Sequence, residues 1–277
     1  MKKNERAAAI VRTIVVSLIA VLFVVPLVWM VLSSLKTAPE VFARPFHWLP
    51  ARVQWQNYAT VWMNEEASML RAFANTLYIA LFSIIGQMFI SSLAAYSFAK
   101  INFKGKQVVF MLFLSSMMVP SQLTIIPRFM LFKTIGLYNN LWAIILPAFF
   151  GATSIFMLRQ FYMGLPNDLI EAAKIGGAGH LRIFLRIMLP LTKAALMSLI
   201  ILAFISSWNE YMAPLIFLVK KELYTVSQNI QWYMLDEFKE HNLTMAAATS
   251  AIVPVVILFI VGQKYFVEGI ATSGVKG

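Results

Sequence analysis

The sequence has no cysteine, three histidines and only 13% charged residues. Without cysteine, the chain forms no disulfide, has no thiolate nucleophile and holds no cysteine-ligated metal. The histidines are isolated from one another, so the sequence predicts no metal site. The phosphate-loop pattern GxxxxGK[ST] is also missing, which means that the chain supplies no ATP chemistry itself. In soluble domains roughly a quarter of the residues are charged, so this composition is not that of a soluble domain.

Hydrophobic residues make up 60% of the chain, and they are concentrated in six segments with almost no charge. Each segment is long enough for a helix that crosses about 30 Å of hydrocarbon. The segments are continuously apolar and do not alternate, which favours helices over the strands of a membrane barrel. The sequence therefore predicts one all-α transmembrane domain over residues 1–277. The expected spans are residues 13–35, 72–99, 107–131, 138–160, 191–219 and 243–265.

The basic residues predict the orientation of these spans. The first hydrophobic segment follows a basic stretch typical of a secretory signal, but it is too long and no small-residue cleavage site follows it, so we interpret it as a retained span. An even number of spans places both termini on one side, and the basic loop Lys100 to Lys106 favours the cytoplasm. The net charge of +11 is scattered over loop ends, so no nucleic-acid surface is indicated.

Residues 163–190 form a polar insert between the fourth and fifth expected spans. Asp168 followed by Glu171 predicts a helix start, with Asp168 as the N-cap. Gly176 and Gly177 predict the end of that short helix, because glycine adopts the left-handed C-cap conformation without steric cost. A second amphipathic helix follows, and Pro190 is expected to end it where the fifth span begins. Two roles remain open for the insert: a docking surface for another protein, or an interfacial helix on lipid headgroups.

The insert also carries a motif. Glu171-Ala172-Ala173, three residues, Gly177, nine residues, Ile187, one residue and Leu189-Pro190 resemble the EAA loop of ABC importer permeases. Gly176 stands where that family usually has aspartate. Further segments resemble the maltose-type carbohydrate uptake permeases. These are Pro120-Ser121-Gln122, Leu158-Arg159-Gln160-Phe161, Trp208-Asn209-Glu210-Tyr211 and the terminal Gly274-Val275-Lys276-Gly277.

This resemblance implies a type I ABC importer fold, in which six transmembrane helices carry a cytoplasmic coupling helix between spans 4 and 5. It also implies a homologous second permease, two ATPase subunits that use ATP and Mg, an extracellular solute-binding protein and a location in the bacterial cytoplasmic (inner) membrane. The chain itself is expected to be non-catalytic and to bind no cofactor. The residues expected to couple to the ATPase are Glu171, Ala172, Ala173, Lys174, Gly177, Arg182, Leu189 and Pro190, together with the tail Gly274, Val275, Lys276 and Gly277.

A second group of residues is expected to line the substrate pathway. Glu210 interrupts the fifth span, and a carboxylate facing lipid costs about 2.5–3.5 kcal/mol, so it should face the bundle interior or an aqueous cavity. Sugars are bound by aromatic rings together with amides and carboxylates. Alternatively, Glu210 pairs with a cation on the sister permease. The expected pathway residues are Trp208, Asn209, Glu210, Tyr211, Gln87 and Gln122.

Three functional classes follow from these features. The first is the permease of an ATP-driven sugar importer, with a related importer of glycerol-phosphate-type solutes as a variant. The second is a self-sufficient secondary transporter with Glu210 as its ion-coupling carboxylate, and the third is a membrane anchor that only scaffolds a partner. The EAA loop favours the first. No cluster of intramembrane arginines demands an anion, so the sequence favours a neutral mono- or oligosaccharide.

Overall fold

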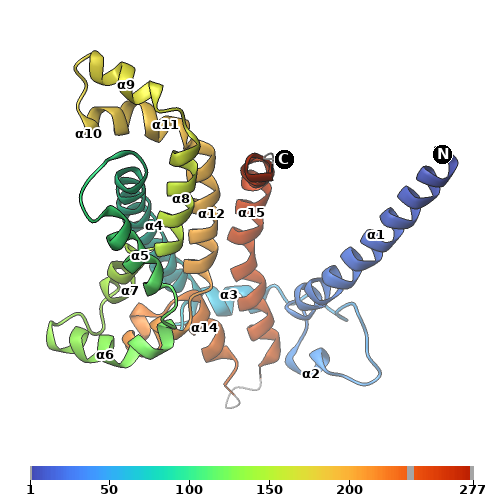
Figure 1. The fold of residues 1–277 in the computed structure, drawn as a ribbon. Helices are drawn as coiled ribbons and strands as arrows, with labels where there is room; N and C mark the ends of the chain where they lie inside the picture. Colours follow the sequence, from blue (N-terminus) through green and yellow to red (C-terminus); the bar gives the residue numbers. More distant parts are fainter. Residues whose placement is uncertain (1, 236–239, 275–277) are drawn as a thin grey trace. The chain divides into compact units, whose positions relative to one another are not determined.

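The structure is a computed structural model that describes residues 2–235 and 240–274. Within these residues every regular element is a helix, which confirms the all-α prediction. The chain divides into two compact units, residues 1–70 with 229–253 (unit 1) and residues 71–228 with 254–277 (unit 2). Figure 1 labels most of the helices along the chain. The two units are described separately below.

Unit 1 contains α1 (Lys2–Ser33), α2 (Ala38–Val41), α3 (Gln56–Met63), the end of α14 (Val226–Tyr233) and the first part of α15 (His241–Gly274). The side chain of Asn57 ties its loops together, because Nδ2 donates to the carbonyls of Ser34 and Lys36, each at 2.8 Å. Asn242 at the start of α15 donates to Asn57 Oδ1 at 3.0 Å. One buried amide therefore fixes the connection between α1, α3 and α15.

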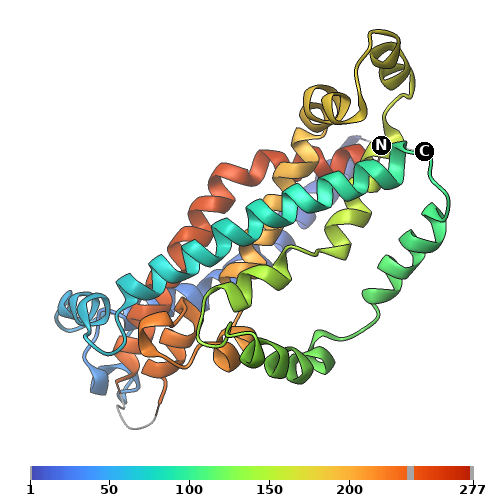
Figure 2. The ribbon, with the colours of Figure 1, turned by 90° about the vertical axis from the view of Figure 1, so that its left-hand side faces the viewer.

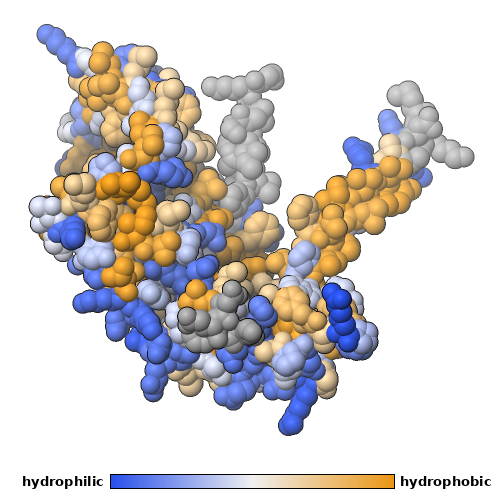
Figure 3. Space-filling view, turned by 90° about the horizontal axis from the view of Figure 1, so that it is seen from below, coloured by the Kyte–Doolittle hydropathy of each residue, from blue (hydrophilic) through white to orange (hydrophobic). Residues whose placement is uncertain are grey.

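The surface of α1 is apolar along most of its length. Large side chains such as Leu18, Leu22 and Phe23 are exposed, at 66%, 70% and 72%. Figure 3 shows this helix as a rod covered by hydrophobic residues. A helix that is hydrophobic on all sides is suited to a lipid or protein environment and not to water. This surface fits the expectation that the first segment is a retained span.

The longest helix of unit 2 is α4 (Met69–Lys100). Its first two residues belong to unit 1. Around it lie α5 (Lys106–Ser116), α7 (Trp142–Ala148), α8 (Ala152–Gly164) and α12 (Lys193–Trp208). Figure 2 shows α4 running beside α8 and α12. The shorter elements of this unit are α6 (Ser121–Thr134), α9 (Asp168–Ile175), α10 (His180–Ile183), the π-helical turn Phe184–Met188, α11 (Leu189–Leu191), α13 (Met212–Phe217) and the 3₁₀ turn Lys221–Leu223.

Three expected spans are interrupted in the structure. The third is divided into α5 and α6, whose axes differ by 94°, and the fourth has a break between α7 and α8. The fifth expected span ends its helix at Trp208 and resumes as α13 at Met212. Proline and glycine lie at or beside two of these breaks, since Pro120 precedes α6 and Gly151 precedes α8.

The number of spans stays a prediction. Among the described residues, four helices are long and apolar enough to cross a membrane: Ala8–Ser34, Met69–Lys100, Trp142–Gly164 and His241–Gln263. Two further pairs, α5 with α6 and His180–Leu191 with α12, pass the same test together but are strongly bent. If each bent pair is one span, the total is up to six.

Candidate functional site

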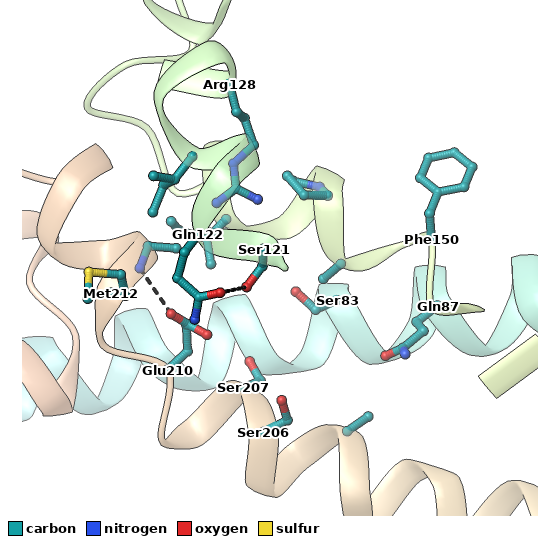
Figure 4. Close-up of a pocket in the computed structure, with 17 residues that line it drawn as sticks. Ser83, Gln87, Ser121, Gln122, Arg128, Phe150, Ser206, Ser207, Glu210 and Met212 are labelled. Atoms are coloured by element: carbon teal, nitrogen blue, oxygen red, sulfur yellow. Dashed lines mark hydrogen bonds between the residues drawn. The ribbon is translucent and has the colours of Figure 1, made fainter. Parts of the chain in front are cut away.

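Unit 2 contains a cavity of about 440 Å³, within the range of about 300–1,000 Å³ that is usual for small-molecule pockets. Its walls come from α4, α6, the end of α7, the end of α12 and the start of α13 (Figure 4). Serine hydroxyls, two glutamines and one charge of each sign face it. The polar lining residues are Ser83, Gln87, Ser121, Gln122, Arg128, Ser206, Ser207 and Glu210.

The cavity lies where three of the helix breaks of unit 2 meet, those before α6, before α8 and before α13. Ser121 begins α6 directly after the first break, Gly151 lies in the second, and Glu210 lies in the third. Ser83 and Gln87 reach it from near the middle of the 32-residue α4. Non-helical backbone at membrane depth is tolerated where it lines a water-filled cavity or is buried in protein. Discontinuous helices also form the solute sites of many transporters.

Glu210 is held in its break by the helix that follows. One carboxylate oxygen accepts a hydrogen bond from the Ala213 N–H at 2.9 Å, and thereby satisfies a free donor at the start of α13. The side chain is half-buried and its carboxylate points into the cavity (Figure 4). Arg128, on α6, lines the same cavity. The expectation that Glu210 faces an internal cavity is met within this chain.

Arg128 and the four serines of the cavity were not among the predicted pathway residues. Arg128 extends from α6 over the ring of Phe217, with the guanidinium carbon 5.0 Å from the ring centre. Its Nε is buried and has no hydrogen-bond partner. Arg128 and Glu210, both within the described part of the chain, form no ion pair. The signal for Arg128 was a cation inside the expected third span, just after Pro120-Ser121-Gln122.

Two glycines allow the walls of the cavity to approach closely. A Cβ atom on Gly151 would lie 2.3 Å from Nε2 of Gln87, and one on Gly86 would lie 2.2 Å from Cε1 of Phe149. Both distances are too short for real contacts, so the connection between α7 and α8 rests directly on α4. Gln87 also donates to the Ser154 hydroxyl at 3.1 Å. The wall formed by α4 and α8 is thus held by close packing and one polar contact.

The structure brings half of the expected pathway residues together. Gln87, Gln122 and Glu210 line the cavity. Trp208 does not: it is 3% exposed, stacks on Phe204 with ring centres 5.4 Å apart and meets Phe73 edge to face at 5.3 Å. Its large ring is used for packing between α12 and α4. Trp208 therefore does not line this cavity, and its place in the pathway stays a prediction.

The two neighbours of Glu210 also lie outside the cavity lining. Asn209 is exposed and donates from Nδ2 to the carbonyl of Ile205 at 2.9 Å, so it caps the end of α12. Tyr211 is half-buried and precedes α13. At a helix break, consecutive side chains no longer point in the directions that a continuous helix would give them. The prediction assumed a continuous fifth span, so it did not account for this change.

Residues 163–190, called the hairpin below, form a separate surface at the end of α8 (Figure 1). Ile170 anchors α9, since it is buried in the cluster that also contains Tyr162 and Phe184. The opposite face is open. Exposed residues of the expected coupling set are Glu171, Ala172, Lys174, Gly177, Arg182 and Pro190, whereas Ala173 and Leu189 are half-buried. Ile175, at the end of α9, is 90% exposed.

Two details of the hairpin differ from expectation. The N-cap position of α9 is Asn167 and not Asp168, and no side chain caps the helix. Asn167 Oδ1 instead accepts a hydrogen bond from Lys100 Nζ at 2.7 Å, a charge-assisted contact that is stronger than a neutral cap. Of the two glycines, Gly177 alone adopts the left-handed conformation, with φ 78°.

The second helix of the hairpin ends at Leu191, one residue after Pro190, close to the predicted end. Helical structure continues from His180 to Leu191, and the chain turns by 77° at Thr192 before α12. The Thr192 hydroxyl donates to the carbonyls of Met188 and Leu189 at 3.1 and 3.0 Å, which satisfies carbonyls at the turn. Pro190 has no N–H to donate to the preceding turn, and a π-helical turn, Phe184–Met188, lies directly before Leu189 and Pro190.

The hairpin is linked to the end of α4 by side chains. Lys100 Nζ donates to the Leu165 carbonyl at 2.7 Å in addition to Asn167. The Tyr96 hydroxyl is 3.1 Å from Nδ1 of His180, and its ring packs on Phe184 with centres 5.5 Å apart. These contacts join the hairpin to α4, the helix that carries Ser83 and Gln87. Of the expected tail, Gly274 is the last residue of α15, and Val275, Lys276 and Gly277 lie outside the described residues.

Comparison with known proteins gives a consistent result. Residues 87–272 match the family model described as binding-protein-dependent transport system inner membrane component. The arabinooligosaccharides transport system permease protein of Bacillus subtilis (strain 168) is 33% identical over 267 residues, with 96% of this chain and 95% of that protein covered. The sn-glycerol-3-phosphate transport system permease protein of Pectobacterium atrosepticum is 29% identical, with 94% of each chain covered.

A solved structure is similar in fold. It is the crystal structure of a bacterial ABC transporter involved in the import of the acidic polysaccharide alginate. Its matching chain superposes with a TM-score of 0.84 at 23% sequence identity, covering 95% of this chain and 98% of that one. At this level of identity the likeness concerns the fold. The overall fold of this chain is therefore one that a solved transporter chain also has.

Proposed function

Because this chain belongs to the family of binding-protein-dependent transport system inner membrane components, we propose that it conducts a mono- or oligosaccharide through the cavity of unit 2 by alternating access. The chain is a permease subunit of a sugar ABC importer and an integral protein of the inner membrane. Such a subunit is not a catalyst. A partner ATPase and a solute-binding protein complete the importer.

The hairpin is the proposed site of coupling to the ATPase. Its outer face, with Glu171, Ala172 and Lys174, is exposed, while Ile170 is buried on the inner side. Alanines leave a low surface that lies close to another protein, and the flanking charges supply polar contacts. In this proposal two ATPase subunits use ATP and Mg, one holding this hairpin and the other that of a homologous second permease. The C-terminal tail approaches the same ATPase pair.

The observation that carries the proposal is the physical link between this surface and the cavity. Lys100 and Tyr96 fasten the hairpin to α4, and Ser83 and Gln87 lie on the same helix in the cavity wall. A rigid helix transmits a displacement along its length. A pull on the hairpin therefore changes the cavity, as alternating access requires.

Orientation follows from the same assignment. An ATPase lies in the cytoplasm, so the hairpin must face the cytoplasm, and with six spans both termini lie there too. The basic loop between α4 and α5, which contains Lys104, supports this orientation through the positive-inside rule. The solute-binding protein then delivers sugar from the opposite side of the membrane.

A second substrate class is favoured by one observation. The similarity to a glycerol-phosphate permease, together with Arg128 in the cavity, is compatible with an anionic solute. Sugar transport is the proposal that we develop, because Arg128 is opposed by Glu210 and a neutral hydroxylated solute suits this pair.

ATP-dependent uptake tests the proposed coupling. In membrane vesicles that contain the assembled importer and its binding protein, Glu171→Lys should reduce uptake of the sugar to background while the chain still inserts. The matched control is Glu222→Lys, which makes the same charge change at an exposed residue of the Lys221–Leu223 turn. Undiminished uptake in the Glu171 variant would favour a self-sufficient secondary transporter. Uptake that survives deletion of the whole gene would reduce the chain to a scaffold.

A further inference from the structure

Arg128 and Glu210 place opposite charges in one cavity without joining them. One carboxylate oxygen of Glu210 accepts a hydrogen bond from the Ala213 N–H. Arg128 presents a buried Nε with no hydrogen-bond partner. The guanidinium of Arg128 and the carboxylate of Glu210 both point toward the cavity (Figure 4).

The two groups differ in what they offer to a ligand. A guanidinium only donates hydrogen bonds, and a carboxylate at neutral pH only accepts them. A sugar hydroxyl does both, so hydroxyls of one ring satisfy both groups at once. The lining also includes Ser121, Ser206 and Ser207, whose hydroxyls donate and accept as well. This is a lining for a solute with many hydroxyls.

Charge balance restricts the solute further. Arg128 is the cation and Glu210 the anion among the residues that line the cavity, so their charges cancel. A phosphate or carboxylate near Arg128 would also face Glu210, which repels it at short range in a partly desolvated space. The balance also removes the need for a cation on a sister permease to neutralise Glu210.

We propose that Arg128 and Glu210 act as a balanced donor–acceptor pair that makes this cavity a transit site for uncharged sugars and disfavours anionic ones. Glu210 is then a specificity-determining residue, and its removal opens the site to anions. This inference rests on the proposed pathway through the cavity, which it deepens by naming the charge class of the substrate.

The absence of cysteine makes a direct test available. A single Ser206→Cys replacement puts one thiol of this chain in the cavity wall. The assembled importer, in membrane vesicles without ATP, is treated with three methanethiosulfonate reagents of similar size: neutral, anionic and cationic. Modification of this chain is followed by peptide mass. The reagents act as small test solutes. The rate at which each reagent modifies the cavity thiol is divided by the rate at which it modifies a free thiol in solution, which corrects for intrinsic reactivity.

The expected result is that the anionic and cationic reagents react at similar normalised rates when Arg128 and Glu210 are both present. Glu210→Gln should raise the ratio of anionic to cationic rate on the order of tenfold, and Arg128→Gln should lower it by a similar factor. Lys133→Gln is the matched control, because Lys133 is an exposed cation on the same helix that does not line the cavity. It should leave the ratio unchanged.

The outcomes separate the inference from the function it rests on. A thiol that reacts with all three reagents, but with a ratio that neither variant moves, would overturn the charge-balance inference and leave the pathway standing. A strong preference for the anionic reagent with both residues intact would also overturn it. A thiol that reacts with no reagent would show that water does not reach the cavity. That result would reject the pathway and the inference together.

Discussion

The hairpin and the cavity are both polar interruptions of an apolar chain, but they are assembled differently. The hairpin is one continuous segment of 28 residues, from 163 to 190, and its shape depends on local features such as the left-handed Gly177. The cavity collects side chains from residue 83 to residue 213 and depends on three helix breaks that meet in space. The hairpin should therefore tolerate substitutions in other parts of the chain, whereas the cavity depends on every helix that forms its walls.

This difference predicts how substitutions act. Changes on the outer face of the hairpin should impair coupling while the chain keeps its stability. Changes in the cavity walls should alter both stability and solute handling, since the same close contacts create the walls and the space. The four predictions below are ordered by the expected size of the effect, and each would fail if the two regions behaved alike.

The largest effect is expected at the turn of the hairpin. Gly177→Val forces a β-branched residue into the left-handed region, at a cost of about 1–2 kcal/mol. The turn then reshapes and moves the face that includes Glu171. ATP-dependent uptake should fall to background, although the purified complex keeps most of its thermal stability. The measurement is uptake in vesicles beside the melting temperature of the complex.

The control for that variant is Gly136→Val. Gly136 has nearly the same conformation, with φ 77°, and like Gly177 it has no atom within 4 Å of the added Cβ. The backbone strain is therefore comparable, but the position lies outside the hairpin, between α6 and α7. Equal losses of uptake in both variants would mean that strain alone, and not the coupling surface, explains the result.

The second prediction concerns the cavity wall. Gly86→Ala places a methyl group 2.2 Å from the Phe149 ring, so the ring and the connection between α7 and α8 must shift. Overpacking of this kind costs about 1–3 kcal/mol. We expect a lower melting temperature together with a raised KM for uptake, because Gly151 and Phe150 of the same connection line the cavity.

Gly164→Ala provides the comparison for this variant. Gly164 ends α8, and nothing lies within 4 Å of its added Cβ. Alanine favours the helix over glycine, so stability should stay the same or rise slightly. A Gly86 variant with an unchanged melting temperature and KM would show that the wall yields easily, and would remove the contrast with the hairpin.

The sequence predicted the hairpin better than the cavity, because the hairpin is formed by one continuous segment. The helix–turn–helix of the hairpin was predicted because its helix starts and glycine turn are local features. Its coupling residues were predicted from the resemblance to the EAA loop. The local prediction failed where a distant residue intervened. Lys100 is 67 positions from Asn167, and its hydrogen bond replaces the expected cap.

The cavity was predicted only in part for the same reason. Glu210 was identified because a carboxylate within an apolar span is costly, and Gln87 because amides bind the hydroxyls of sugars. Arg128 and the serines were missed, since their role depends on breaks in α5–α6 and α12–α13 that hydropathy does not locate. Trp208 was placed in the pathway by residue type, but two aromatic neighbours, Phe73 and Phe204, bury it.

The third prediction tests the link between the two regions. Tyr96→Phe removes the hydroxyl that contacts His180 and keeps the ring that packs on Phe184. One such hydrogen bond contributes about 0.5–1.5 kcal/mol. Transport per ATP hydrolysed should fall, because the hairpin then has one contact fewer with α4. The stability of the complex should change little. Tyr138→Phe, on a tyrosine outside the hairpin and the cavity, is the control. An unchanged ratio of transport to hydrolysis would assign the link to Lys100 alone.

The smallest effect is expected at Trp208, where packing and binding make opposite predictions. Trp208→Phe keeps an aromatic ring between Phe73 and Phe204 and removes only part of the side-chain volume, so most of the packing is retained. If the indole only packs, the melting temperature falls slightly and the KM for sugar uptake does not change. Gln87→Leu, at a residue that lines the cavity, should raise KM instead. A Trp208 variant with raised KM and full stability would return the ring to the pathway, through movement of α12 away from α4 during the transport cycle.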